Sequence, residues 1–265
     1  MCYTDDGLEI DMIFETHAHY DDEAFDEDRD LLLSSMAKNN IGTIVNATSS
    51  KKTVETSIEL TKKYPFIYTT VGVHPSDCAE MDDDELKWLE DKLCYEKALA
   101  VGEIGLDYHY DEPSKEIQKK WFEAQIEMAR KASKPLIIHS RDAAKDTLDI
   151  MKALHTEEIG GDIHCFSYSV EIAKEYLNMG FYIGVGGVIT FKNGKKLREV
   201  VEYAPIEQIV LETDSPYLSP EPFRGKRNSS LNLPYVADKI AEIKNMSVDD
   251  VIDITTSNAK KLYKL

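Results

Sequence analysis

The sequence predicts an α/β fold in the form of a closed (β/α)8 barrel. Short runs of β-branched and apolar residues alternate with longer segments of helical periodicity, which is the pattern of parallel βα units. Eight such runs are present, and the 265 residues match the about 250 that one barrel of this kind needs. An open, doubly wound sheet is compatible with much of the same alternation. The position of the polar residues separates the two, and here these residues stand at the ends of several runs.

The alternation starts at residue 12, after a segment without periodicity. We interpret residues 1–11 as an N-terminal extension and residues 12–265 as one TIM-barrel domain, since no linker or low-complexity segment interrupts the pattern. The predicted strands are 12–16, 42–47, 67–73, 98–104, 136–139, 162–165, 182–185 and 208–211.

Helices are predicted between these strands wherever their ends can be read. The first contains Leu31, Leu32 and Met36 and is stopped by the Asn39-Asn40-Ile41-Gly42 segment. Another begins with the acidic residues 82–85, which suit the positive end of a helix dipole.

The later helices have clearer start signals. Ser114 is a candidate N-cap for a long helix that ends before Pro135. Residues 235–244 form a further helix, and the spacing of Ser247 and Asp250 is that of a capping box for the last one.

The composition is that of a soluble globular protein. Apolar residues make up 42% of the chain, and no apolar run approaches the ~20 residues of a membrane helix. The N-terminus is acidic and lacks the basic start and apolar core of a signal peptide, and the four cysteines show no Cys-x-x-Cys spacing. We therefore expect a cytoplasmic protein with no membrane contact and no obligate protein partner, most simply a monomer.

The formal net charge is −18, which repels phosphate backbones. Most of these acids are expected on solvated helix faces. The exceptions are two basic clusters, residues 192–198 and 224–227. A nucleic-acid substrate would have to be drawn by such local groups or by bound cations.

Residues of the types that bind metals stand at the ends of the predicted strands. His17 and His19 project to the same face of an extended strand, so they can bind one metal ion. In a parallel barrel the strand ends meet at one mouth, where the other candidates also fall. These are Glu103, His139, His164 and Asp214, with His74 after the third strand.

Four histidines and two carboxylates exceed what one tetrahedral zinc site requires. They suit two divalent cations about 3.5–4 Å apart, which can activate water and hold both the attacking and the leaving oxygen of a phosphodiester. The implied reaction is hydrolysis. Donors of this mixed kind admit zinc, manganese, iron or magnesium, so the metal stays open.

These residues belong to motifs through which residues 12–265 resemble the TatD family of metal-dependent deoxyribonucleases, within the amidohydrolase-like barrels. The motifs are Thr16-His17-Ala18-His19, Gly72-Val73-His74-Pro75, Gly102-Glu103-Ile104-Gly105-Leu106-Asp107-Tyr108, Ile138-His139-Ser140-Arg141-Asp142-Ala143, His164-Cys165-Phe166-Ser167, Gly184-Val185-Gly186-Gly187 and Glu212-Thr213-Asp214-Ser215-Pro216-Tyr217-Leu218.

The resemblance implies a site for two divalent metals and 3′-to-5′ removal of nucleotides from DNA ends. By this resemblance His17 and His19 bind the first metal and Glu103 bridges to the second. The second metal is held by His139 and His164. Glu103 and Asp214 would be catalytic, with Asp214 contacting the first metal and orienting or deprotonating the nucleophilic water.

Three positions depart from the family pattern. Glu15 stands where Asp is usual, Tyr168 where Gly is common, and Phe223 where we expect His. None removes a metal ligand, so they bear on substrate preference and loop geometry rather than on hydrolysis.

Other residues near the mouth have two interpretations each. For His74 alone a hydrogen-bonded edge residue is simpler, but at this mouth it is a candidate for substrate binding. Arg141 could bind a phosphate or cap its own helix. Arg224 and Arg227 could meet a nucleic-acid strand or simply lie in a solvated loop.

Two further motif positions favour structural roles. The Gly186-Gly187 pair is interpreted as a tight βα turn, since its spacing is not that of a phosphate loop. Cys165 should alternate away from His164 on its strand, as a buried structural thiol.

Two other functions remain open. The same metals could hydrolyse an acyl or amide bond, as in a D-aminoacyl-tRNA deacylase. The absence of a lysine at a metal-bearing strand end and the presence of Glu103 as the bridge favour phosphodiesters. A barrel whose metals only stabilise it is the remaining alternative, although structural metal sites are usually closed.

Overall fold

Eight parallel strands form one sheet in the computed structural model, which describes residues 2–3, 9–10 and 12–265. The strands follow chain order, so each pairs with the next one along the sequence. The strands are β3 (Ile13–Ala18), β4 (Ile41–Asn46), β5 (Ile67–Val71), β6 (Ala98–Asp107), β7 (Leu136–Arg141), β8 (Gly161–Ile163), β9 (Tyr182–Val185) and β10 (Ile209–Leu211).

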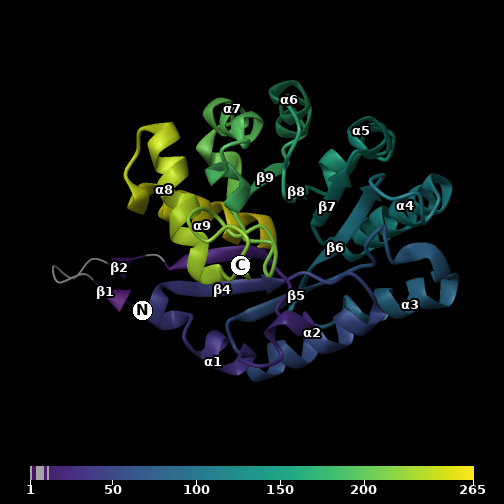
Figure 1. Cartoon of the computed structure of the whole chain (residues 1–265). Helices are drawn as coiled ribbons and strands as arrows, with labels where there is room; N and C mark the ends of the chain where they lie inside the picture. Colours follow the sequence, from purple (N-terminus) through teal and green to yellow (C-terminus); the bar gives the residue numbers. More distant parts are fainter. Residues whose placement is uncertain (1, 4–8, 11) are drawn as a thin grey trace.

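Helices surround this sheet on its outer face (Figure 1). The α-helices are α1 (Arg29–Ser34), α2 (Lys51–Lys63), α3 (Asp83–Lys92), α4 (Lys115–Ala132), α5 (Ala144–Ala153), α6 (Val170–Asn178), α7 (Lys195–Tyr203), α8 (Leu233–Lys244) and α9 (Val248–Tyr263). The 3-10 turns are η1 (Glu23–Phe25), η2 (Ala37–Asn39), η3 (Cys78–Glu80), η4 (Thr156–Glu158), η5 (Gly187–Thr190), η6 (Ile206–Gln208) and η7 (Ser230–Asn232).

The first and last strands close the sheet into a barrel just beyond their ends. Ala18 forms a parallel bridge with Ser215, and the His19 N–H donates to the Ser215 carbonyl at 2.8 Å. The Asp214 N–H donates to the His17 carbonyl at 3.0 Å. These bonds join the segments that carry His17, His19 and Asp214, so closing the barrel also brings these side chains together.

Glu15 strengthens the same junction between β3 and the segment after β10 from inside the barrel. This fully buried carboxyl group accepts hydrogen bonds from the N–H and hydroxyl of Thr213 and from the Ser230 hydroxyl. It also accepts from the N–H of His17 at 3.2 Å. Burial raises the pKa of Glu15 to about 8. Glu15, one of the three positions at which the sequence departs from the family pattern, therefore holds β3 against the loop after β10.

All eight predicted strands are confirmed, with differences at their ends. β6 continues three residues beyond the predicted end at Ile104, to Asp107. β8 stops at Ile163 instead of reaching Cys165, because Cys165 has a left-handed backbone with φ of 47°. Gly186 and Gly187 form the predicted tight connection from β9 into η5.

Helix starts follow the capping residues that the sequence indicates. Asp82 accepts from the N–H groups of Asp84 and Glu85 at the start of α3. Ser114 caps α4, and Ser247 accepts from the Asp250 N–H at the start of α9. Such side-chain acceptors satisfy amide groups that have no partner inside the helix.

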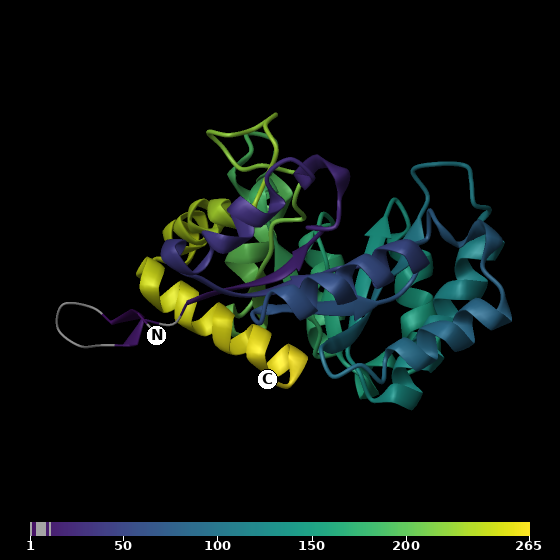
Figure 2. The ribbon, with the colours of Figure 1, turned by 90° about the horizontal axis from the view of Figure 1, so that it is seen from below.

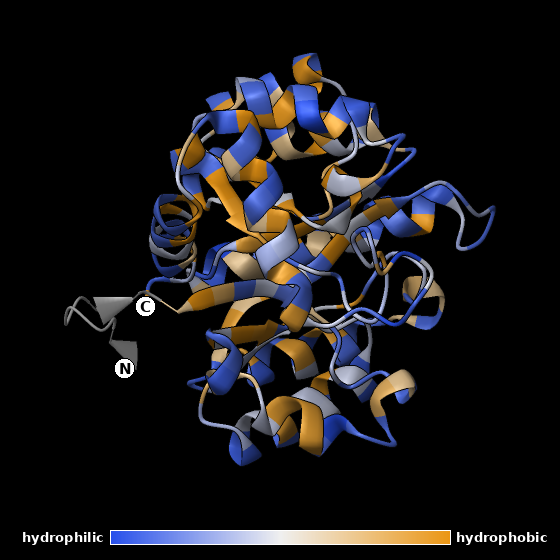
Figure 3. Ribbon diagram, turned by 60° about the vertical axis from the view of Figure 1, so that its left-hand side comes forward, coloured by the Kyte–Doolittle hydropathy of each residue, from blue (hydrophilic) through white to orange (hydrophobic). Residues whose placement is uncertain are grey.

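The core lies between the strands and the inner helix faces. Figure 3 shows hydrophobic residues along the central strands and mixed colours on the helices, as expected for amphipathic helices packed on a barrel. No helix among the described residues is long and apolar enough to cross a membrane.

The described part of the N-terminal segment forms a separate pair of strands, β1 (Cys2–Tyr3) and β2 (Glu9–Ile10), which run antiparallel. In Figure 2 this pair lies apart from the barrel. The assignment of residues 1–11 as an extension of one barrel domain stays a prediction, and its remaining residues lie outside those described.

Candidate metal centre

The mouth of the barrel brings together all six predicted metal ligands around Glu103. This carboxylate lies on β6, is 4% exposed and has a different set of histidine nitrogens near each of its two oxygens. The strand order places β3, β6, β7, β8 and the loop after β10 around the same opening. The structure therefore places the predicted ligands in one spatial cluster, and their binding of metal stays a prediction.

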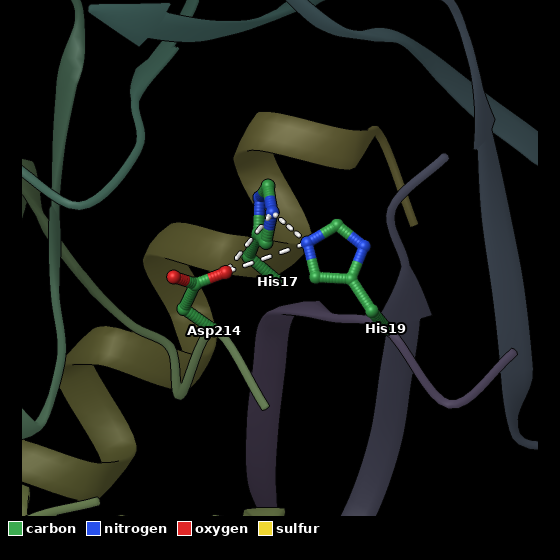
Figure 4. Close-up of side chains that lie close together, drawn as sticks. All are labelled: His17, His19 and Asp214. Atoms are coloured by element: carbon green, nitrogen blue, oxygen red, sulfur yellow. Dashed lines mark hydrogen bonds and ion pairs between the residues drawn. The ribbon is translucent and has the colours of Figure 1, made fainter. Parts of the chain in front are cut away.

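The first set of donor atoms comes from His17, His19, Asp214 and one oxygen of Glu103. The Nε2 atoms of the two histidines are 3.2 Å apart, and Asp214 Oδ1 lies 3.4 Å from His19 Nε2 and 4.0 Å from His17 Nε2 (Figure 4). Glu103 Oε2 lies 3.5 and 3.7 Å from the same two nitrogens. Ligands about 2.0–2.1 Å from a tetrahedral metal are about 3.3 Å apart, so this set has the right size for one ion.

The second set surrounds the other oxygen of Glu103. Oε1 lies 2.7 Å from His139 Nδ1 and 3.4 Å from His164 Nε2. All three side chains offer donor atoms within reach of one ion. Glu103 thus faces one candidate site with each oxygen, which is the arrangement of a bridging carboxylate.

In three of the four ligand histidines, a hydrogen bond at one ring nitrogen leaves the other nitrogen directed at the centre, whereas the buried Nδ1 of His17 has no hydrogen-bond partner among the described residues. His19 Nδ1 is 3.2 Å from the Ala47 carbonyl, and His164 Nδ1 is 3.2 Å from Glu212 Oε2. His139 Nε2 is 3.3 Å from Asp107 Oδ2. An acceptor at one nitrogen fixes the proton there and leaves the lone pair of the other nitrogen for a metal. The residues present therefore fit two divalent ions.

The carboxylates of the centre are ionised. Burial by itself would raise the pKa of Glu103, but the adjacent His164, His17 and His74 and the hydrogen bond from His139 hold it well below its usual range. Burial would also raise the pKa of Asp214, but the hydrogen bond from His19 and the charges of nearby histidines outweigh burial and lower this pKa. Both carboxylates are thus ready to bind cations.

We expect metal binding to weaken as the pH falls. Although burial opposes it, the carboxylates of Asp214 and Glu103 raise the pKa of His19 to about 9, and carboxylates likewise raise the pKa of His139 and of His164. Below these pKa values a metal must displace a proton from each ring, so affinity increases with pH and binding releases protons, with the proton of His19 competing up to about pH 9.

Calorimetric titration of the chelator-treated protein with Mn²⁺ or Zn²⁺ measures this release. Repeating it at pH 7 in buffers of different ionisation enthalpy counts the protons. We expect more than one proton per chain. An affinity that is constant between pH 6 and 9 contradicts the expectation.

His74 lies at the same mouth but is arranged as a hydrogen-bond donor. Its Nδ1 accepts from the Ser76 N–H at 3.1 Å, and its Nε2 faces Glu103 Oε1 at 3.8 Å. Burial, assisted by the nearby His139, lowers the pKa of His74 to about 3, so the ring is neutral and its proton is on Nε2. The predicted role of His74 in substrate binding stays a prediction, since His74 also offers a ligand atom close to those of Asp107 and His139.

Arg141 is the last residue of β7 and is exposed at the rim. Among the described residues no carboxylate forms an ion pair with it, and helix α5 begins without any side-chain cap. The alternative in which Arg141 caps its own helix therefore finds no support.

Tyr168, another departure from the family pattern, fixes the neighbouring loop, because its hydroxyl lies 3.0 Å from the Ser140 hydroxyl and accepts from the Ala143 N–H.

The prediction for Cys165 is wrong. Alternation along a strand would turn its side chain away from His164, but the left-handed backbone at Cys165 breaks that alternation. The thiol lies within metal-ligand reach of His164 and Asp214 and is partly exposed. Burial raises the pKa of Cys165 well above its usual value, so the thiol stays protonated.

The two basic loop residues differ in their contacts. Arg227 donates to both carboxylate oxygens of Asp28, at 2.7 and 2.6 Å, and to the Ala24 carbonyl. It therefore joins the loop after β10 to the η1–α1 segment, and these two segments protrude on the same side in Figure 2. Arg224 lies over the Phe191 ring at 4.3 Å and remains exposed. Phe223 packs edge-on against Tyr235.

Two carboxylates that support the centre were not predicted as site residues. Glu212 and Asp107 are buried, and each faces the outer nitrogen of one ligand histidine. Both occur inside motifs noted from the sequence. Strand periodicity contains a signal for Asp107, which lies four residues after Glu103 on β6, an even spacing along one strand. Glu212 lies just beyond the end of β10, where that periodicity gives no signal.

We expect Glu212→Gln to weaken binding at the second site about 10- to 100-fold, the usual cost of losing a partner that orients a ligand. The amide retains the volume but presents a donor group toward His164 Nδ1 or the Cys165 N–H, which both need acceptors. Metal titration should show one weakened site and one unchanged site. Glu207→Gln, an exposed position just before β10, is the matched control. Equal affinities in both variants contradict the assignment.

A family model described as TatD related DNase matches residues 14–264. The chain belongs to the TatD family. The metal-dependent hydrolase YabD of Bacillus subtilis is 42% identical over 254 residues, covering 96% of this chain and 100% of that protein. YcfH of Escherichia coli K12 is 38% identical, with 73% and 72% coverage. Both are named uncharacterized metal-dependent hydrolases.

Solved structures of TatD proteins share the same fold. YJJV, a TatD homologue from Escherichia coli K12, superposes with a TM-score of 0.91 at 28% identity, covering 97% of this chain and 100% of that one. A TatD family hydrolase from Entamoeba histolytica gives 0.87 at 26% identity, with 97% and 99% coverage. Together with the cluster of metal-binding residues, these relationships make the protein a metal-dependent hydrolase of the TatD family.

Proposed function

We propose that the protein is a 3′-to-5′ exodeoxyribonuclease that hydrolyses phosphodiester bonds with two divalent metal ions. The observation that carries the proposal is Glu103, whose two oxygens face two separate sets of histidine nitrogens. Two ions held there would lower the pKa of water and neutralise charge on the phosphoryl oxygens. The TatD related DNase description of the matching family model supports the same class of substrate.

The side chains around the centre have separate tasks in this reaction. Asp214 is ionised, and because it lies beside the first set of nitrogens it can orient water and accept its proton. The neutral His74 can donate its Nε2 proton to a phosphoryl oxygen. Arg141, without an ion-pair partner among the described residues, can bind a phosphate with its paired N–H groups.

Solvent access favours a catalytic over a purely structural centre. The side chains of His19, His74, His139 and Asp214 are each 15–17% exposed, whereas structural metal sites are usually closed. The acyl- or amide-hydrolase alternative rests on the net charge of −18, which favours an uncharged substrate.

The experiment is digestion of single-stranded DNA labelled at its 3′ end. Chelator-treated protein should be inactive, and Mg²⁺, Mn²⁺ or Zn²⁺ should restore release of labelled mononucleotides. Circular single-stranded DNA, which has no 3′ end, should resist. No release by folded, metal-loaded protein contradicts the proposal, and D-aminoacyl-tRNA is then the next substrate to test.

A further inference from the structure

The rim of the mouth has an aromatic and cationic pair that neither the metal centre nor the core uses. Tyr110 lies in the loop between β6 and α4 and is 60% exposed. The Arg141 guanidinium carbon is 5.9 Å from the centre of the Tyr110 ring. Arg141 is itself exposed, and no carboxylate of the described residues forms an ion pair with it. Both side chains are therefore available to a ligand.

This pair is adjacent to the metal centre. Arg141 lies two residues beyond His139 on β7, on the same face of the strand, and pairs in register with Asp107, which supports His139. Two residues of extended strand span about 7 Å. A group bound by Arg141 is thus one short step from the donor atoms around Glu103.

The two loops that carry the pair are joined to each other. The Tyr108 N–H donates to the Arg141 carbonyl at 2.9 Å, and the His109 N–H donates to Asp107 Oδ1 at 2.9 Å. The His109 ring also lies 3.5 Å from Asp142 and packs edge-on against Tyr110. Tyr110 and Arg141 are therefore held near each other before any ligand binds, which lowers the entropic cost of binding.

The chemistry of the pair matches a nucleotide strand. A planar ring exposed at a rim can stack on any base, and a guanidinium beside it can bind the phosphate. The exposed Asp111 and Glu112 next to Tyr110 repel phosphates. The base would therefore lie over Tyr110, and the phosphate would lie on the Arg141 side.

We propose that Tyr110 and Arg141 form a binding site for the single-stranded 3′ end of DNA, with Tyr110 stacking on a base and Arg141 holding a phosphate next to the bond that is cut. The inference rests on the proposed nuclease function. It adds to that function a site that selects strands with exposed bases over small phosphodiesters.

The test is the binding of a fluorescent, phosphorothioate-protected oligothymidylate, which measures affinity without turnover. Tyr110→Ala should weaken binding about 10-fold or more, and Tyr110→Phe should bind like the wild type because only the ring stacks. On an oligonucleotide with abasic 3′ positions, Tyr110→Ala should bind like the wild type. Arg141→Ala should weaken binding of both oligonucleotides.

Matched controls are Tyr203→Ala and Lys131→Ala. Tyr203 is 47% exposed at the end of α7, and Lys131 is exposed in the last turn of α4. Both helix ends precede the start of a strand and so lie away from the mouth. Equal affinities for Tyr110→Ala and Tyr203→Ala, or no oligonucleotide binding by the wild type, overturn the proposed site.

Hydrolysis of ethyl 4-nitrophenyl phosphate separates this inference from the proposed function. This small diester has no strand to bind, so Tyr110→Ala should cleave it like the wild type. If the wild type cleaves the small diester and releases nucleotides from DNA, and Tyr110→Ala does both equally well, the nuclease function stands and the strand-binding site is wrong. If the wild type binds the oligonucleotide through Tyr110 but cleaves neither substrate, the strand-binding site stands and the proposed nuclease function is wrong.

Discussion

Glu103→Gln is expected to abolish binding of both metal ions and to lower the rate of nucleotide release at least about 10³-fold. The amide keeps the size of the side chain but has no charge and only one acceptor oxygen. It would also direct an NH2 group at nitrogens that now face Oε1 or Oε2. Both sites share this carboxylate, so a single substitution should remove both, which loss of one outer ligand would not do.

Elemental analysis after dialysis and calorimetric titration measure the bound metal. Glu123→Gln, an exposed position on α4, controls for the loss of one charge. Circular dichroism shows whether the barrel persists. If Glu103→Gln still binds one ion at wild-type affinity, the bridge is assigned to the wrong residue.

The strands were predictable because every one of them is a short run of buried β-branched and apolar residues. Each predicted run became a strand of the barrel, since β-branched and apolar residues fit a sheet covered on both faces. The ligands at the ends of these runs were predictable for the same reason, because parallel strand ends converge at one mouth. Helix α2 was less visible, since its capping box pairs Ser50 with Thr53 in place of the usual Glu or Gln.

The supporting contacts depend on geometry that strand periodicity does not contain. Glu212 reaches His164 only because Gly184 has no side chain, and a Cβ there would lie 2.4 Å from Glu212 Oε2. The thiol of Cys165 enters the site only because a left-handed residue ends β8. For Arg227 the sequence indicates either contact with a nucleic-acid strand or a solvated loop, because its ion-pair partner Asp28 lies in a segment far away along the chain.

Asp214→Asn is expected to lower the rate of nucleotide release about 10²- to 10⁴-fold at saturating metal, the range for loss of a general base. Asparagine keeps the size of the side chain and tolerates the left-handed backbone at this position, where φ is 56°. The fold should therefore persist. The lowered pKa of Asp214 shows that the ionised form dominates, and the amide cannot accept a proton in its place.

Two features separate this loss from weak metal binding. Asp214 Oδ1 is also part of the first donor set, so metal affinity falls as well, but the rate deficit should remain when metal is raised to saturation. The residual rate should also increase with pH, because hydroxide replaces the missing base. A variant that recovers the wild-type rate at high metal makes Asp214 a ligand only. If Asp214→Asn has full activity at ordinary metal concentrations, the result instead supports the alternative in which the metals only stabilise the barrel.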